Sequence, residues 1–198
     1  MTRLLTRFLW APLCALLVAQ GAWGAEATGP GTDKTSSQDT YNQQEMLREA
    51  NKFFGQGAEG LAKVIEKAFK EKGRPNGYIT GEEASGAIGI GLRYGKGTLR
   101  MKDGAHRKVY WQGPSIGFDF GGNASKVFVL VYHLPDVQAI FQRFPGVDGS
   151  LYFVAGVGVN YAQSGNIVLA PVRLGVGWRQ GASVGYMHVT PKQSWNPF

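Results

Sequence analysis

The chain has almost no cysteine and no apolar run long enough to span a membrane. Its only cysteine, Cys14, lies near the N-terminus, and Leu13 before it does not fit a lipoprotein attachment site. A disulfide within the chain is therefore excluded, and we expect no thiol chemistry in the remainder. The longest apolar run, residues 8–18, is eleven residues long and contains Pro12, which is too short to span a bilayer.

That N-terminal segment has the pattern of a secretory signal peptide. Arg3 and Arg7 precede the apolar run, and small residues after it allow cleavage after Gly24 or Ala27. We expect residues 1–24 to be removed on export to the periplasm; an uncleaved anchor is the alternative. Residues 25–39 are mostly Gly, Thr, Ser and Asp, a composition that predicts a disordered linker.

Acidic residues are scarce in the second part of the chain. Residues 26–83 carry eight Lys/Arg and ten Asp/Glu, whereas residues 84–198 carry eleven Lys/Arg and four Asp. The basic part suggests an anionic partner. In an envelope this would be phospholipid, lipopolysaccharide or cell-wall polymer, rather than nucleic acid. The alternative is a basic surface that only keeps the protein soluble.

Residues 40–73 have apolar residues at helical spacing. Thr40 and Gln43 fit a capping box, Gly55 and Gly57 interrupt the pattern, and Gly73 ends it. The pattern predicts one broken amphipathic helix, or two, covering an end or an edge of a barrel. Glutamates on the polar side disfavour a helix lying on an anionic membrane.

Residues 76–198 change to a period of two and hold 21 of the 29 glycines. Repeated glycine in strands indicates sharp curvature, or close approach of another backbone or a ligand. Residues 126–134 are apolar without alternation, which predicts a strand buried on both faces. A short helix is predicted from Pro135-Asp136 to Phe144. The predicted fold is therefore mainly β: a small soluble antiparallel β-barrel, with an N-terminal amphipathic helical segment and one short inserted helix.

Motifs for catalysis are incomplete. Residues 113–117 match G-x-S-x-G, but the sequence after Ser115 continues as a strand rather than the required helix. Residues 91–97 have the wrong spacing for a phosphate loop. The three histidines lie far apart, so we predict no metal and no cofactor. Asp119 is interpreted as a structural acid that could pair with Arg93 or Arg173, and we predict that the protein is not an enzyme.

Polar and aromatic residues beside glycines are the candidate ligand-binding residues. Aromatic groups that line a cavity with arginine at its mouth would suit an amphiphile with an anionic head. The alternative is that the aromatics fill the core, since small barrels are filled by side chains. The candidates are Arg93, Tyr94, Tyr110, Trp111, Tyr132, His133, Arg173 and Trp178.

Three segments carry a resemblance to a known family. Residues 93–97 (RYGKG), 111–122 (WQGPSIGFDFGG) and 126–132 (KVFVLVY) resemble the EipA family of alphaproteobacterial envelope integrity proteins. Parts of the second and third segments also resemble, more weakly, the SYLF lipid-binding domain. The resemblance implies a periplasmic β-barrel that supports envelope integrity and stress resistance, without known catalytic residues. Expected partners are a lipid, lipopolysaccharide, a cell-wall component or an envelope protein; an integral outer-membrane barrel and a cell-wall or lipid-modifying hydrolase are the alternatives.

Overall fold

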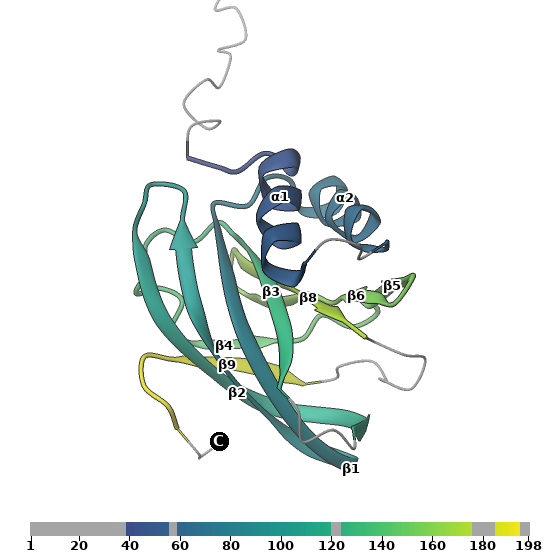
Figure 1. Cartoon of the computed structure of the whole chain (residues 1–198). Coiled ribbons are helices and arrows are strands. Elements are labelled where there is room, and N and C mark those ends of the chain that lie inside the picture. Colours follow the sequence, from purple (N-terminus) through teal and green to yellow (C-terminus); the bar gives the residue numbers. More distant parts are fainter. Residues whose placement is uncertain (1–38, 56–58, 120–123, 176–184, 195–198) are drawn as a thin grey trace, which may run out of the picture. The chain divides into compact units, whose positions relative to one another are not determined.

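A computed structural model of the chain describes residues 39–55, 59–119, 124–175 and 185–194, with the side chains of 85–90 and 115–119 excepted. The expected signal peptide, most of the expected linker and Trp178 lie outside these residues. These residues form two helices and nine strands, most of which are labelled in Figure 1. The elements are α1 (Gln43–Phe54), α2 (Leu61–Lys72), β1 (Gly77–Met101), β2 (His106–Asp119), β3 (Ser125–Tyr132), β4 (Arg143–Pro145), β5 (Tyr152–Val154), β6 (Val157–Val159), β7 (Ala162–Ser164), β8 (Ile167–Leu174) and β9 (Tyr186–Thr190).

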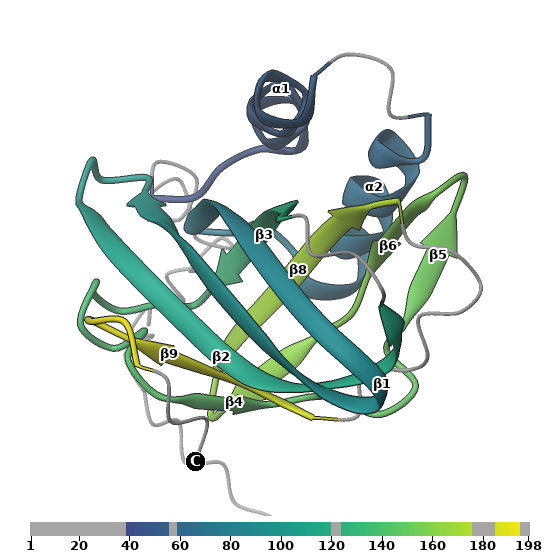
Figure 2. The ribbon, with the colours of Figure 1, turned by 60° about the horizontal axis from the view of Figure 1, so that its bottom comes forward.

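The strands form one curved antiparallel sheet. Their order is β4-β9-β2-β1-β3-β8-β6-β5, and β7 pairs with β8 beside β6. An antiparallel bridge between Gly146, just after β4, and Ala162 of β7 joins the two sides of the sheet. The sheet therefore curls round into a barrel (Figure 2), and the predicted antiparallel barrel is confirmed.

Strand β1 doubles back on itself, so that its two arms run side by side (Figures 1 and 2). The first arm pairs with β3 and the second with β2. Glycines allow the arms to approach closely: a Cβ on Gly97 would lie 2.6 Å from the carbonyl oxygen of Thr80, and a Cβ on Gly81 would overlap that of Lys96. Close approach of another backbone is thus the reason for these glycines, as one of the two sequence interpretations proposed.

The sheet separates two apolar cores, and β3 contributes to both. Val127, Val129 and Val131 face the barrel interior, where they pack with residues from β1, β2, β4, β8 and β9. Phe128 and Leu130 face the outer side, where they pack with α1 and α2. The predicted strand buried on both faces is confirmed, and the helices cover the outer wall of β3, β8 and β6 rather than an end of the barrel.

The two helices begin and end at clear signals. Asn42 and Glu45 form the capping box of α1, each accepting a hydrogen bond from the other's backbone N–H. The predicted cap at Thr40 is wrong, because the helix starts two residues later. Helix α2 ends at Gly73, as predicted. Neither described helix has the length and apolar character needed to cross a membrane.

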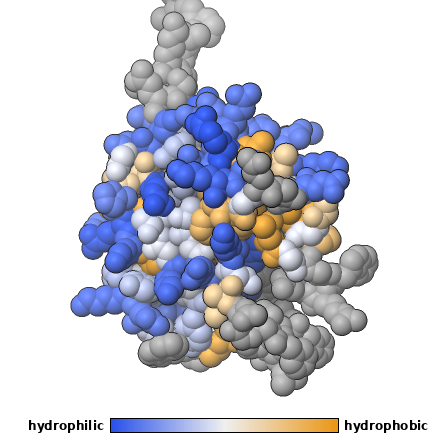
Figure 3. Space-filling model, viewed as in Figure 1, coloured by the Kyte–Doolittle hydropathy of each residue, from blue (hydrophilic) through white to orange (hydrophobic). Residues whose placement is uncertain are grey.

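Aromatic rings at the C-terminal end of α1 pack against the sheet. Phe53 and Phe54 each lie 6.3 Å from Phe128, measured between ring centroids. Figure 3 shows apolar surface beside this end of α1 and hydrophilic residues over much of the rest of that face. Packing against the sheet therefore accounts for the buried residues of α1, Met46 and Ala50, and for the partly buried Phe53 and Phe54.

The short helix predicted after Pro135 is wrong. Asp136 accepts hydrogen bonds from the backbone N–H groups of Gln138 and Ala139, as a helix N-cap would. The backbone then forms turns only, and Phe144 lies in β4, where it pairs with Met187 of β9. Pairing with β9 replaces the helical hydrogen bonds that the apolar spacing had suggested.

Candidate functional site

A cluster of charged side chains lies at one end of the apolar barrel interior, around the carboxylate of Glu83. Arg173 donates two hydrogen bonds to it, from Nε to Oε1 at 2.9 Å and from Nη2 to Oε2 at 3.2 Å. Nε of Arg93 lies 3.2 Å from Oε1, and Nε1 of Trp111 donates to Oε2 at 2.9 Å. The side chain of Glu83 is only 7% exposed, so one buried carboxylate holds two guanidinium groups.

Strand alternation places these groups on the inner face. Glu83 follows Ile79 and Gly81 at every second residue of β1, and Arg173 follows Ile167 and Leu169 in the same way on β8. Gly95 is paired with Trp111 across β1 and β2. A Cβ on Gly95 would overlap the indole ring, so this glycine leaves the space through which Trp111 reaches Glu83.

The charges of the two arginines decide the protonation state of the cluster. Burial alone would raise the pKa of Glu83, but the charges of Arg173 and Arg93, with the hydrogen bonds from Arg173 and Trp111, outweigh it and lower the pKa to about 2. Glu83 is therefore ionised throughout the physiological range. It is suited to holding cations in place and unsuited to donating a proton.

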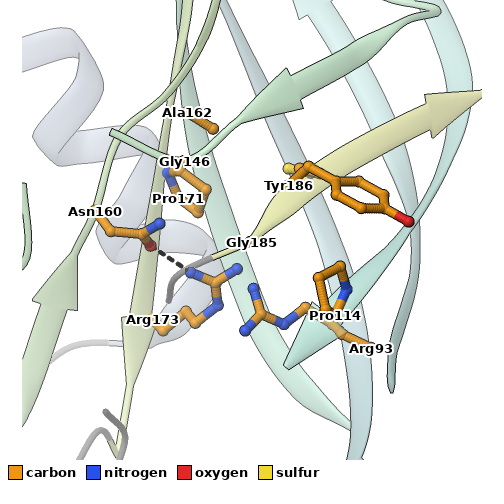
Figure 4. A pocket seen from close by; sticks show the side chains of 10 residues that line it. Arg93, Pro114, Gly146, Asn160, Ala162, Pro171, Arg173, Gly185 and Tyr186 are labelled. Carbon is orange, nitrogen blue, oxygen red and sulfur yellow. Dashed lines mark hydrogen bonds between the residues drawn. The ribbon is translucent and has the colours of Figure 1, made fainter. Parts of the chain in front are cut away.

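A small cavity adjoins this cluster, as Figure 4 shows. Its volume, measured as the space open to the centre of a water molecule, is about 20 Å³, which is enough for one water-sized group. Asn160 accepts a hydrogen bond from Nη1 of Arg173 at 2.9 Å at its edge. The cavity is lined by Arg93, Pro114, Gly146, Asn160, Ala162, Pro171, Arg173, Gly185, Tyr186 and Met187.

A larger hollow lies on the opposite, outer face of β1 and β2. Its volume is about 320 Å³, and residues just after β9 contribute to its wall. Tyr94 and Tyr110 are half-buried there, and Lys96, which is paired with Tyr110 across the strands, is exposed. We call this hollow the outer groove; it is lined by Glu82, Ala84, Tyr94, Gly95, Lys96, Tyr110, Trp111, Gln112, Ala124, Gln193 and Ser194.

Basic side chains continue along the same face beyond the outer groove. Arg100 and Lys108 are exposed, and both share the strand parity of Lys96 and Tyr110. Thr98 is paired with Lys108, and Arg100 with His106. Lys96, Arg100, His106 and Lys108 thus form what we call the basic row, which runs from the outer groove towards the turn between β1 and β2.

The structure divides the predicted ligand-binding residues among four places. Arg93, Trp111 and Arg173 meet inside the barrel, whereas Tyr94 and Tyr110 line the outer groove. Tyr132 is buried in the core under the helices. His133 is exposed beyond β3, with Nδ1 3.2 Å from the carbonyl oxygen of Asn166. Trp178 lies outside the described residues.

Glu83 is the residue that sequence reasoning missed. Asp119 was taken as the candidate partner of the arginines, but its side chain lies outside the described part of the structure, and Glu83 makes both ion pairs. Its position could have been inferred from the alternation Ile79, Gly81, Glu83 in a strand of otherwise apolar inner residues.

Three features of the described residues bear on the catalytic motifs considered in the sequence. They contain no group of three or more His, Cys, Asp or Glu that could hold a metal ion. Ser115 lies within the continuous strand β2, whereas a nucleophile elbow needs a turn from strand to helix. His188 has a pKa that is lowered by burial and by the charge of Arg143, and both effects disfavour the protonated ring.

Comparison with known proteins agrees with this fold. A crystal structure of a β-barrel-like, uncharacterized protein from Brucella abortus matches with a TM-score of 0.74 and 50% sequence identity, covering 81% of this chain and 99% of that one. No match is found among curated proteins. The family model of EipA, envelope integrity protein A, matches residues 39–198. The chain therefore belongs to the EipA family.

Proposed function

We propose that this protein acts in the periplasm, without enzymatic activity, and maintains the cell envelope by binding an anionic amphiphile in the outer groove. The family name supports the role in envelope integrity. The observation that carries the ligand class is the continuity, on one face of β1 and β2, of the tyrosine-lined outer groove with the basic row.

The dimensions and chemistry of the outer groove support this ligand class. Its volume of about 320 Å³ is at the lower end of the range, about 300–1,000 Å³, in which small-molecule sites fall. Tyr94 and Tyr110 offer apolar ring faces with a polar tip, which suits the boundary between an acyl chain and its head group. Lys96 and Lys108 are placed to pair with an anionic head group.

The barrel interior is a poorer place for an acyl chain. Trp111, Leu99 and Phe144 are fully buried in it, and the cavity beside Arg93 and Arg173 holds about 20 Å³. Filling by side chains is what a small barrel is expected to show. The outer groove is therefore the favoured site, and three of the predicted ligand-binding residues line it: Tyr94, Tyr110 and Trp111.

The arrangement of the helices favours a periplasmic protein over an integral outer-membrane barrel. A membrane barrel presents a continuous apolar outer wall to lipid. In this chain the apolar outer wall of β3 and β8 is covered by α1 and α2, and the outer face of β1 and β2 carries the basic row. Cell fractionation tests the location: recovery in the periplasmic fraction, with an N-terminus near residue 25, is expected, and recovery only with the outer membrane would contradict it.

Titration with lysolipids tests the ligand class. Lysophosphatidylglycerol, which is anionic, should bind below its critical micelle concentration more tightly than zwitterionic lysophosphatidylcholine of the same chain length. Tyr110→Ser should weaken both, and Lys96→Gln should remove the preference for the anionic lipid. Lys70→Gln on α2, exposed and far along the chain from the groove, is the control and should change neither. If Tyr110→Ser, Lys96→Gln and Lys70→Gln all bound each lipid with the same affinity, the proposal would be overturned.

A further inference from the structure

We infer that the outer face of β1 and β2 docks on the surface of a membrane that contains anionic lipid, with the basic row against the lipid head groups. This role rests on the proposed function, because it names a bilayer as the source from which the outer groove takes its amphiphile. Three features of the face carry it: the exposure of the basic row, its excess of positive charge, and an apolar side chain at its other end.

The basic row presents its charges to solvent. All four of its side chains are exposed. Among the residues that the structure describes, none of the ion pairs involves Lys96, Arg100 or Lys108. Arg100 donates one hydrogen bond to the hydroxyl of Thr80 at 2.9 Å, a neutral acceptor that leaves its charge in place. These cations are therefore open to an anionic partner.

Acidic side chains near the row offset little of its charge. Glu82 in the outer groove is paired across β1 and β3 with Lys126, a residue of the opposite sign. Asp103 lies in the turn, where it accepts a hydrogen bond from the backbone N–H of Ala105. Helix α1, by contrast, has two glutamates, one arginine and one lysine. The face of β1 and β2 thus has a positive excess that attracts an anionic surface.

The row is long enough to meet more than one head group. Lys96 and Arg100 are four residues apart on β1, which is about 13 Å along a strand. Lys108 adds a cation on the neighbouring strand, opposite Thr98. Cations spread over this length fit a surface with many anionic groups better than a single anion. Each basic residue near an anionic membrane strengthens binding roughly fivefold.

An apolar side chain on the same face favours a membrane over a soluble anionic polymer. Leu92 shares the strand parity of Tyr94 and Lys96 and is 38% exposed. Tyr94 follows Leu92 on this face and lines the outer groove before the basic row begins. Apolar and aromatic groups beside basic ones match the interface of a bilayer. A soluble anionic polysaccharide would gain nothing from Leu92.

Flotation of the whole protein with vesicles tests the docking. Vesicles of phosphatidylcholine alone are compared with mixed vesicles that also contain phosphatidylglycerol. At about 0.1 M salt the protein should float with the mixed vesicles only, and about 1 M salt, where the Debye length falls to about 3 Å, should release it. Equal flotation with both kinds of vesicle, or with neither, would overturn the inference. Binding to polygalacturonate, a soluble anionic polysaccharide, without flotation would overturn it in favour of a cell-wall polymer.

A matched pair of charge reversals links the docking to the basic row. Lys108→Glu removes one positive charge and adds one negative charge, so binding to the mixed vesicles should fall at least about tenfold. Lys70→Glu makes the same change at an exposed position on α2 and should lower binding far less. Equal losses in the two variants, or no loss in Lys108→Glu, would refute this face as the docking surface.

The vesicle and lysolipid experiments separate the docking from the groove. Binding of lysophosphatidylglycerol without flotation would refute the docking and leave the outer groove as the binding site. Flotation that Lys108→Glu abolishes, in a protein that binds no lysolipid, would support the docking and refute the groove.

Discussion

Replacing Glu83 with glutamine should destabilise the protein strongly. Glutamine has nearly the same shape but no charge, so it leaves the guanidinium groups of Arg93 and Arg173 in a buried place without their shared carboxylate. It also replaces charge-assisted hydrogen bonds from Arg173 and Trp111 with weaker neutral ones.

Two independent routes give the same magnitude for this change. Removing one partner of a buried ion pair costs about 3–5 kcal/mol. The shift of the Glu83 pKa from 4.5 to about 2 corresponds to roughly 3 kcal/mol, since each pKa unit is about 1.4 kcal/mol. We therefore expect the free energy of unfolding to fall by about 3 kcal/mol at neutral pH, which is a large part of the roughly 5–15 kcal/mol that a domain has.

Urea denaturation, followed by tryptophan fluorescence, measures the change. The matched control is Glu82→Gln, the same substitution one residue earlier, where the side chain is exposed on the outer face. The control should lie within about 0.5 kcal/mol of the unaltered protein. If Glu83→Gln is as mild as Glu82→Gln, the buried cluster does not hold the barrel end together, and the reasoning from its geometry is refuted.

Three further predictions follow from named contacts. On acidification, the difference in free energy of unfolding between the unaltered protein and Glu83→Gln should stay constant down to about pH 4.5 and then disappear towards pH 2. A carboxylate whose pKa is lowered to about 2 in the folded protein loses its contribution to stability as the pH falls from the unfolded pKa to the folded one. A difference that persists at pH 2 contradicts the assignment. Gly95→Ala should lower the free energy of unfolding by about 1–3 kcal/mol, since its methyl group would overlap the rigid indole of Trp111. It should also alter the near-ultraviolet circular dichroism. Unchanged spectra and stability would show that the indole of Trp111 does not pack over this glycine. Asn42→Ala should lower the free energy of unfolding in urea by about 1 kcal/mol, because the N-terminal cap of α1 is lost. This loss should be larger than the loss caused by Thr40→Ala. The reverse order would support the cap predicted from the sequence.

The sequence predicted those parts of the fold that local patterns determine. Two-sided burial of β3 could be predicted because the run from Val127 to Val131 has no polar residue to mark an exposed face. The end of α2 at Gly73 could be predicted because glycine and nearby lysines mark helix C-termini. The prediction of a helix up to Phe144 failed because a distant segment forms hydrogen bonds with the same backbone groups. Phe144 has helical spacing in the sequence, but its backbone pairs with β9 as a strand.

The candidate site was only partly predictable, because strand alternation gives the face of a residue but not its neighbours across the sheet. Tyr94 and Arg93 are adjacent in sequence and lie on opposite faces of β1, so the single predicted site separates into the outer groove and the interior cluster. The fold of β1 back on itself brings Glu83 to Arg93, and no local pattern in the sequence shows that return.

Native mass spectrometry after mild purification from the periplasm of its own cells tests the central claim most directly. The unaltered protein should carry an additional mass, and lipid extraction should identify it as an amphiphile with an anionic head group. Tyr110→Ser, purified in the same way, should lose most of that mass. A protein that is free of any amphiphile in its own periplasm, or a bound amphiphile that Tyr110→Ser retains in full, would contradict binding in the outer groove.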